Sequence, residues 1–151
     1  MLKKVAALTA VAVLTAGVAS AAPLGDTVIV TSSNTADNQL RVYDTSGTLI
    51  QEVPTLGQGG ASGNAGGIAT TSNGIVAVVN FGSQTVSLFA RGEAGFALHQ
   101  TIPTTSQPVS VAFGTSHLYV LGTTTVESHR IGPDGVEAAA DGTVGLLLAD
   151  G

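Results

Sequence analysis

The sequence of 151 residues has no cysteine and no tryptophan, and only 10% of its residues are charged. Without cysteine, neither a disulfide framework nor a metal site built from thiolates is available to the chain. The 44% of hydrophobic residues argue against a disordered chain. The formal net charge of −5 becomes −7 when the N-terminal lysines, Lys3 and Lys4, are left out. This balance argues against nucleic acid and anionic membrane surfaces as partners.

The first 21 residues have the pattern of an export signal. Lys3 and Lys4 give a positively charged start, residues 5–16 are apolar, and residues 19–21 (Ala-Ser-Ala) form a small-residue cleavage site. The apolar stretch is short for a membrane span and is interrupted by threonine. We therefore expect residues 1–21 to be a cleaved signal peptide. The mature domain, residues 22–151, is expected in the bacterial periplasm or outside the cell, without a membrane anchor.

The mature part shows strand patterns throughout, and only the run VEAAA at 136–140 is ambiguous between strand and helix. The clearest pattern is the pair Ile75–Val79 and Thr85–Phe89, which flanks a polar turn with Gly82 to supply conformational freedom. It predicts an antiparallel hairpin. A second hairpin is predicted from His117–Leu121 with Thr124–Arg130.

The hairpin belongs to a repeat with a period near 40 residues. The matching positions of the second and third copies are Ile68 with Val109, Val78 with Val120, and Val86 with Val126. The first copy aligns at a larger offset, which the glycine-rich stretch 56–67 explains as an insertion. The predicted repeats span 27–55, 67–103 and 108–140, with the start of another at 143–151. Four short strands in such a period are typical of a β-propeller blade, a four-stranded antiparallel sheet that stacks on its neighbours.

The two ends of the pattern predict an incomplete propeller of about three blades. The first copy begins at the second strand of a blade, and residues 144–149 (VGLLLA) match the first strand of a further blade. We interpret the sequence as the N-terminal part of a longer propeller that is marginally stable or associates with itself. The apolar residues expected on open faces or edges are Ile29, Leu40, Val42, Leu146 and Leu148.

Residues 67–89 and 109–135 resemble blades of the lactonase-like, YVTN-type propellers. Asn73-Gly74, Ala77–Asn80 and Thr85–Phe89 match that pattern best, whereas the third copy has Gly122 where asparagine is usual. The resemblance covers roughly residues 27–151 and implies the propeller fold. The superfamily includes sugar-lactone hydrolases as well as non-catalytic binding modules, so the resemblance does not choose between them.

The glycine-rich stretch carries no catalytic motif. Residues 57–62 approach a phosphate-binding glycine pattern, but Ser62 stands where the last glycine belongs and no helix follows. Ser62 is also out of register for the serine motif of hydrolases. We interpret the stretch as a flexible connector.

The remaining polar residues do not form a recognisable site. His99, His117 and His129 fall on separate predicted strands without metal-ligand spacing, and each is expected to be a partly exposed strand residue. The aspartates expected to stabilise turns are Asp37, Asp44, Asp134 and Asp141. A calcium loop at Asp37-Asn38 is not favoured because the required run of acidic residues is missing. The aromatic residues expected to pack between blades are Tyr43, Phe89 and Phe113.

The sequence favours an exported propeller scaffold or binding module without a catalytic site of its own. It assigns no catalytic, cofactor-binding or metal-binding residue, and it predicts no cofactor. The alternative is the N-terminal part of a lactonase-like enzyme that hydrolyses a sugar lactone. The resemblance implies that such an enzyme gathers histidine, arginine and carboxylates around its axis, and we cannot place that set here. The partner is an unnamed ligand or protein, and self-association through unpaired blades is a third possibility.

Overall fold

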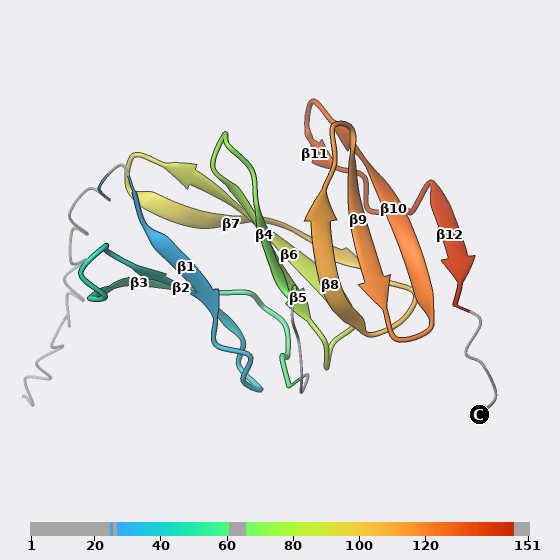
Figure 1. The fold of residues 1–151 in the computed structure, drawn as a ribbon, viewed down its shortest axis with the longest axis horizontal. Helices are drawn as coiled ribbons and strands as arrows, with labels where there is room; N and C mark the ends of the chain where they lie inside the picture. The colour runs from blue at the N-terminus through green and yellow to red at the C-terminus, as the bar shows by residue number, and fades with distance from the viewer. Residues whose placement is uncertain (1–24, 26, 61–65, 147–151) are drawn as a thin grey trace, which may run out of the picture.

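The computed structural model describes residues 25, 27–60 and 66–146, and these residues form three antiparallel β-sheets (Figure 1). The expected signal peptide, residues 1–21, lies outside this range. Within the described residues there is no helix that is long and apolar enough to cross a membrane. The prediction of an all-β chain is confirmed.

The three sheets follow one another along the chain. Sheet 1 has the order β1 (Ile29–Ser32), β2 (Gln39–Tyr43) and β3 (Leu49–Pro54). Sheet 2 has the order β4 (Ile68–Thr70), β5 (Ile75–Asn80), β6 (Thr85–Gly92) and β7 (Gly95–Pro103). Sheet 3 contains β8 (Pro108–Phe113), β9 (His117–Gly122), β10 (Thr125–Gly132), β11 (Gly135–Val136) and β12 (Gly142–Gly145). The predicted hairpins are confirmed as the pairs β5–β6 and β9–β10.

Sheet 2 lies between the other two sheets and is buried on both faces (Figure 1). Along β5, Val76 and Val78 pack towards sheet 1, whereas Ala77 and Val79 pack towards sheet 3. Successive residues of a strand point to opposite faces, so an unbroken apolar run is what a doubly covered strand requires. The sheets therefore stack face to face, as propeller blades do.

The open faces differ from the prediction in one respect. Ile29 and Leu146 are 50% and 36% exposed, but Leu40 and Val42 are fully buried. The last two residues pack with Phe89 in the core between sheets 1 and 2. The reason is the alternation of β2, which turns these two side chains inwards and leaves the residues between them on the other face. Leu148 lies outside the described residues.

The edge of sheet 3 also differs from the prediction. Residues 142–145 form β12, which overlaps the segment 143–151 expected to begin another blade, and β12 pairs with β10 through Val126–Val144 and Ser128–Gly142. β11 pairs only with Ile131 and Gly132, so the first half of β10 is left without an outer neighbour until β12 fills that edge. The order β8–β9–β10–β12 thus completes a four-stranded blade. Residues 147–151 lie outside the described range.

The described part of the glycine-rich stretch is anchored on the β5–β6 turn. The N–H of Gly82 donates to the carbonyl of Gln58 at 2.8 Å, and the N–H of Asn38 donates to that of Gly57 at 3.1 Å. A Cβ on Gly82 would lie 2.9 Å from the carbonyl oxygen of Gly59. Gly82 therefore permits a close approach, and Gln84, with φ of 53°, takes the left-handed conformation that we expected of Gly82. The sequence suggested a flexible connector, but residues 56–60 are held in place by these hydrogen bonds.

Candidate functional site

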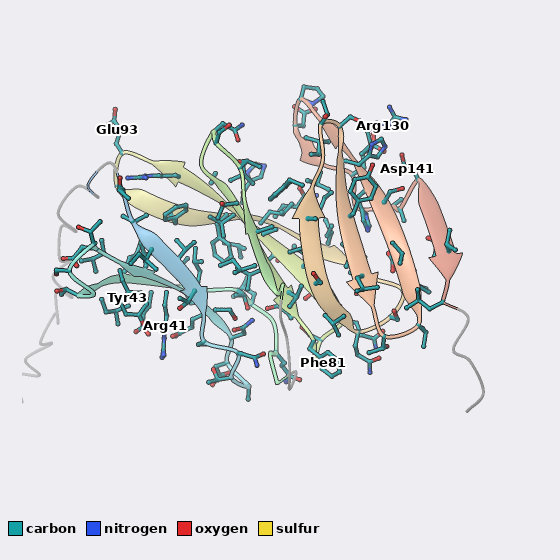
Figure 2. The ribbon with its side chains drawn as sticks, in the orientation of Figure 1. Arg41, Tyr43, Phe81, Glu93, Arg130 and Asp141 are labelled. Atoms are coloured by element: carbon teal, nitrogen blue, oxygen red, sulfur yellow. The ribbon has the colours of Figure 1, made fainter. Side chains whose placement is uncertain are left out.

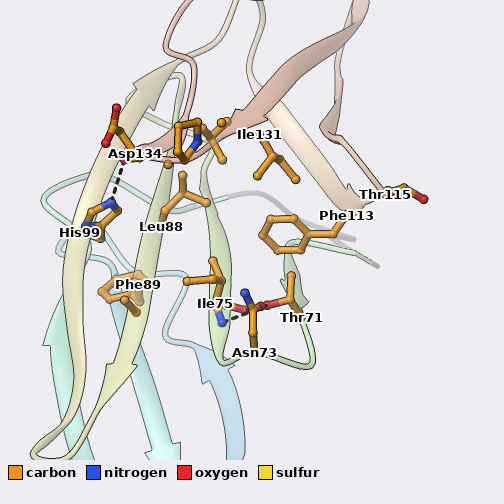
Figure 3. A pocket seen from close by; sticks show the side chains of 16 residues that line it. Thr71, Asn73, Ile75, Leu88, Phe89, His99, Phe113, Thr115, Ile131 and Asp134 are labelled. Atoms are coloured by element: carbon orange, nitrogen blue, oxygen red, sulfur yellow. Dashed lines mark hydrogen bonds between the residues drawn. The ribbon is translucent and has the colours of Figure 1, made fainter.

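A groove of about 660 Å³ opens between sheets 2 and 3 (Figure 3). Its floor is apolar and includes Ile75 and Leu88 of sheet 2 and Phe113 and Ile131 of sheet 3. Leu88 and Phe113 lie on opposite sides of this floor in Figure 3. The turns after β4, β8 and β10 contribute Asn73, Thr115 and Asp134 to the lining of the groove.

The rim of the groove is polar. Thr71 Oγ1 donates to Asn73 Oδ1 in the β4–β5 turn, at 2.5 Å. On the other side, His99 Nε2 lies 3.4 Å from the backbone oxygen of Asp134, and it must be the donor because a carbonyl only accepts. The Asp134 turn is tight because Gly135 has φ of 127°. The arrangement offers an amide, a hydroxyl, an imidazole and a carboxylate around an apolar floor.

A polar junction joins sheets 1 and 2. Asn38 and Asn80 are 2% and 0% exposed, and Asn38 Nδ2 donates to Asn80 Oδ1 at 2.9 Å. Asn80 Nδ2 donates to the hydroxyls of Thr85 and Ser87, at 3.0 and 2.8 Å. Asn38 Oδ1 accepts backbone and hydroxyl hydrogen bonds from its own loop. The polar atoms of Asn38 are therefore used within the fold. Asn80, the asparagine at the end of β5 that belongs to the resemblance, is a buried link between sheets 1 and 2.

A second cluster lies on the outward face of sheet 3. His117 Nε2 is 2.7 Å from Asp141 Oδ2, and Ser116 Oγ is 2.9 Å from His117 Nδ1. Ser128 Oγ donates to Asp141 Oδ1 at 2.6 Å. Arg130 Nη2 lies 3.9 Å from Asp141 Oδ2, and both residues lie at one end of the sheet (Figure 2). The pairing of β12 with β10 is what carries Asp141 to this place.

The hydrogen bonds from Ser128 and His117 lower the pKa of Asp141 below its ordinary value of 3.8. Because the folded state holds the ionised carboxylate, this stabilisation is complete above the unfolded value and is lost as the pH falls through the folded pKa. We expect denaturant unfolding of the wild type and of Asp141→Asn to differ by a constant amount above about pH 4. The difference should shrink below pH 3.8. Parallel curves down to pH 2 would refute this role for the carboxylate.

His129 is 1% exposed, so the expectation of a partly exposed residue is wrong. Its Nδ1 donates to the backbone oxygen of Glu137 at 3.0 Å. Its Nε2 lies 3.3 Å from Oε2 of Glu127, itself 3% exposed, and has no hydrogen-bond partner among the described residues. Glu127 Oε1 also accepts from the N–H of Thr105 at 2.5 Å. The pair fixes the β7–β8 connection against β10 and is closed to ligands by burial.

The other sequence expectations fall at separate places. Asp44 accepts from the N–H groups of Ser46 and Thr48, both at 2.9 Å, which confirms its turn role. Phe89 is fully buried between sheets 1 and 2, and Phe113 packs between sheets 2 and 3. Ser62 lies outside the described residues. Within the described ranges, no three His, Asp or Glu side chains are placed to hold one metal ion.

Sequence reasoning missed the cluster of Ser116, His117 and Asp141. The sequence alone gives no reason to join His117 and Asp141, because they are 24 positions apart and the strand that brings them together is predicted to belong to a further blade. The only local signal is the Ser-His dipeptide in the β8–β9 turn. It becomes informative only once the register of β12 is known.

Comparisons with known proteins bear on the fold. No family model and no curated protein matches the sequence. A protein of unknown function from Desulfotomaculum acetoxidans matches with a TM-score of 0.64 and 19% identity, over 79% of this chain and 38% of that one. A proposed 6-phosphogluconolactonase from Bacteroides uniformis matches with a TM-score of 0.57 and 17% identity, over 79% and 40%.

Another proposed 6-phosphogluconolactonase, from Bacteroides fragilis, matches with a TM-score of 0.51 and 16% identity, over 78% of this chain and 35% of that one. The chain thus spans less than half the length of each of these structures. The YVTN-type repeat gains no support from family models. At these identities the likeness concerns the fold. The chain is an all-β protein whose antiparallel sheets have the propeller-type arrangement of its lactonase-like structural neighbours.

Proposed function

We propose that the chain is an exported, propeller-type binding module and that its ligand binds in the groove between sheets 2 and 3. The groove itself carries this proposal. Its volume of about 660 Å³ falls within the range of small-molecule sites, roughly 300–1,000 Å³. An apolar floor with a few convergent polar groups is the usual composition of such sites.

The chemistry of the groove suits a sugar ring or a sugar acid. The C–H face of a pyranose can pack on the ring of Phe113, while its hydroxyl groups reach the polar rim. Asn73 offers an amide and Asp134 a carboxylate at opposite sides of that rim. A ligand of this class needs both surfaces at once, because its two faces differ in polarity.

Saturation-transfer NMR with glucose and gluconate as probes tests this proposal. We expect magnetisation transfer to the ring C–H protons in the wild type and its loss in Phe113→Ala. Tyr119→Ala is the matched control, because Tyr119 is an exposed aromatic residue of the same sheet outside the groove. Equal transfer in wild type and Phe113→Ala, or no transfer from the wild type to either probe, would refute the assignment of the groove.

The alternative function is hydrolysis of a sugar lactone, and the fold of two proposed 6-phosphogluconolactonases favours it. Opening of glucono-δ-lactone releases a proton, so a pH-stat measures it directly. A rate above that of buffer, proportional to protein concentration, would support the enzyme. A rate equal to that of buffer leaves the binding module as the better account of the groove.

Export and self-association belong to the same proposal. Cleavage before residue 22 is checked by N-terminal sequencing of exported protein, and a mature chain beginning at Met1 would contradict it.

The outer sheets carry exposed apolar side chains, among them Ile29 and Leu49 on sheet 1 and Leu121 on sheet 3, at 50%, 43% and 40% exposure. Such surfaces favour association between copies. Light scattering that shows a monodisperse monomer of the mature chain would exclude it.

A further inference from the structure

Three side chains on the outward face of sheet 3 form a continuous chain of hydrogen bonds. Ser116 lies in the β8–β9 turn, His117 begins β9, and Asp141 precedes β12. Ser116 Oγ is 2.9 Å from His117 Nδ1, and His117 Nε2 is 2.7 Å from Asp141 Oδ2. The backbone also fixes the aspartate, because the N–H of Asp141 donates to the carbonyl of Ser128 at 2.9 Å.

The proton positions follow from the acceptors. An ionised Asp141 can only accept, so His117 Nε2 carries the hydrogen of that bond. The neutral imidazole then has its lone pair on Nδ1, which accepts from the hydroxyl of Ser116. A serine that donates to a base, which a carboxylate orients in turn, is the arrangement that activates a nucleophile. The two ring nitrogens are exchanged relative to the serine-protease order.

The surroundings allow a substrate to approach. Ser116 is exposed, and the side chains of His117 and Asp141 are 22% and 28% exposed. Arg130 lies directly opposite His117 in the sheet register and holds its guanidinium 3.9 Å from Asp141. A cation here can stabilise negative charge that develops on an oxygen. The ring of Tyr119, 6.0 Å from the His117 ring, adds an apolar surface beside the histidine.

We propose that Ser116, His117 and Asp141 form a site, separate from the groove, that hydrolyses small carboxylic esters. Ser116 Oγ attacks the ester carbonyl carbon and its proton passes to His117 Nδ1. The carbon–oxygen bond to the alcohol then breaks, and His117 returns the proton to the departing alcohol. Water attacks the acyl-serine, gives a proton to His117, and releases the carboxylic acid as Ser116 regains its hydroxyl hydrogen. Asp141 acts as a positioning residue, and the inference does not rest on sugar binding.

Labelling of the mature chain with a fluorophosphonate probe tests the nucleophile. We expect one adduct per chain, located on Ser116 by peptide mass spectrometry, and none in Ser116→Ala. Ser46→Ala is the matched control, because Ser46 is an exposed turn serine whose Oγ donates to Asp44 at 2.6 Å. No adduct on Ser116, or equal labelling of Ser46, would overturn the assignment.

Hydrolysis of p-nitrophenyl acetate tests the base. His117→Gln should lower the serine-dependent rate by about 100-fold or more, which is the usual contribution of a general base. An exposed histidine can also attack this ester directly. The two routes are distinguished by Ser116→Ala: loss of the rate supports the site, and an unchanged rate overturns it.

Two single-cysteine variants test the site independently, in case Ser116→Ala changes the conformation of the β8–β9 turn. The chain has no cysteine, so Ser116→Cys and Ser46→Cys each carry a single thiol. A base beside a thiol raises its thiolate fraction at neutral pH. We expect iodoacetamide to alkylate Ser116→Cys about tenfold faster than Ser46→Cys, the effect of one pKa unit. The faster alkylation of Ser116→Cys should disappear in the double variant that also carries His117→Gln. Equal alkylation rates of Ser116→Cys and Ser46→Cys, with His117 in place, would contradict the proposal.

Discussion

Replacing Asn80 by leucine should destabilise the chain by about 2–3 kcal/mol, because buried polar groups would lose their partners. Asn80 is fully buried, accepts from Asn38 and donates to Thr85 and Ser87. Leucine has a similar shape, branched at Cγ, but offers neither donor nor acceptor. The packing around the side chain is tight, since a Cβ on Gly57 would collide with it. Denaturant unfolding measures the loss.

A matched control is Asn73→Leu. Asn73 lies in the exposed β4–β5 turn, where water can replace its hydrogen bond to Thr71. We expect its effect to stay within about 0.5 kcal/mol, as for most surface substitutions. Equal destabilisation by Asn80→Leu and Asn73→Leu would contradict the prediction that the buried hydrogen bonds of Asn80 stabilise the packing of sheets 1 and 2.

The largest expected loss of stability follows from Phe89→Ala. Phe89 is fully buried and packs with Leu40, Val42 and Phe96 between sheets 1 and 2. Truncation of a buried phenylalanine costs about 3–5 kcal/mol, which includes the cavity left behind. That loss is a large fraction of the total stability of a domain, about 5–15 kcal/mol.

Tyr119→Ala serves as the control for this truncation, because Tyr119 is 46% exposed on the outward face of sheet 3. It should cost less than about 1 kcal/mol. If Phe89→Ala lowered the unfolding midpoint no more than Tyr119→Ala, the core between sheets 1 and 2 would not exist as described.

The hairpins could be predicted because their signals are local. The apolar strands Ile75–Val79 and Thr85–Phe89 flank a polar turn, and each strand needs only its neighbour to form. The face that a strand buries depends on which sheet packs against it, and that packing involves residues distant in the sequence. The sequence therefore places Leu40 and Val42 on an open face, although the alternation of their own strand is regular.

The candidate sites depend on still longer-range pairing. His117 meets Asp141 only because β12 returns to β10, and the sequence 144–149 matched the first strand of a blade equally well. The burial of His129 next to Glu127 follows from the packing of sheet 3 on sheet 2, which its alternating strand pattern does not reveal. Two charged or polar residues on a strand normally indicate an exposed face.

One departure from the repeat pattern that the sequence resembles has a structural explanation. Gly122 takes the place that Asn80 holds in sheet 2, and the hydroxyl of Ser106 occupies the space where a Cβ at position 122 would lie. Ser106 Oγ is 2.8 Å from Thr125 Oγ1. The third sheet thus replaces an asparagine by a serine that comes from the preceding connection, a substitution that alignment of single positions does not detect.

A double-mutant cycle between Asn38 and Asn80 tests most directly whether sheets 1 and 2 are consecutive blades packed face to face. The two residues are 42 positions apart, and their side chains meet only if that packing is correct. We expect Asn38→Ala, Asn80→Ala and the double variant to give a coupling energy of about 1–2 kcal/mol by denaturant unfolding. Additive effects, with coupling below about 0.3 kcal/mol, would contradict the stacking of the two sheets.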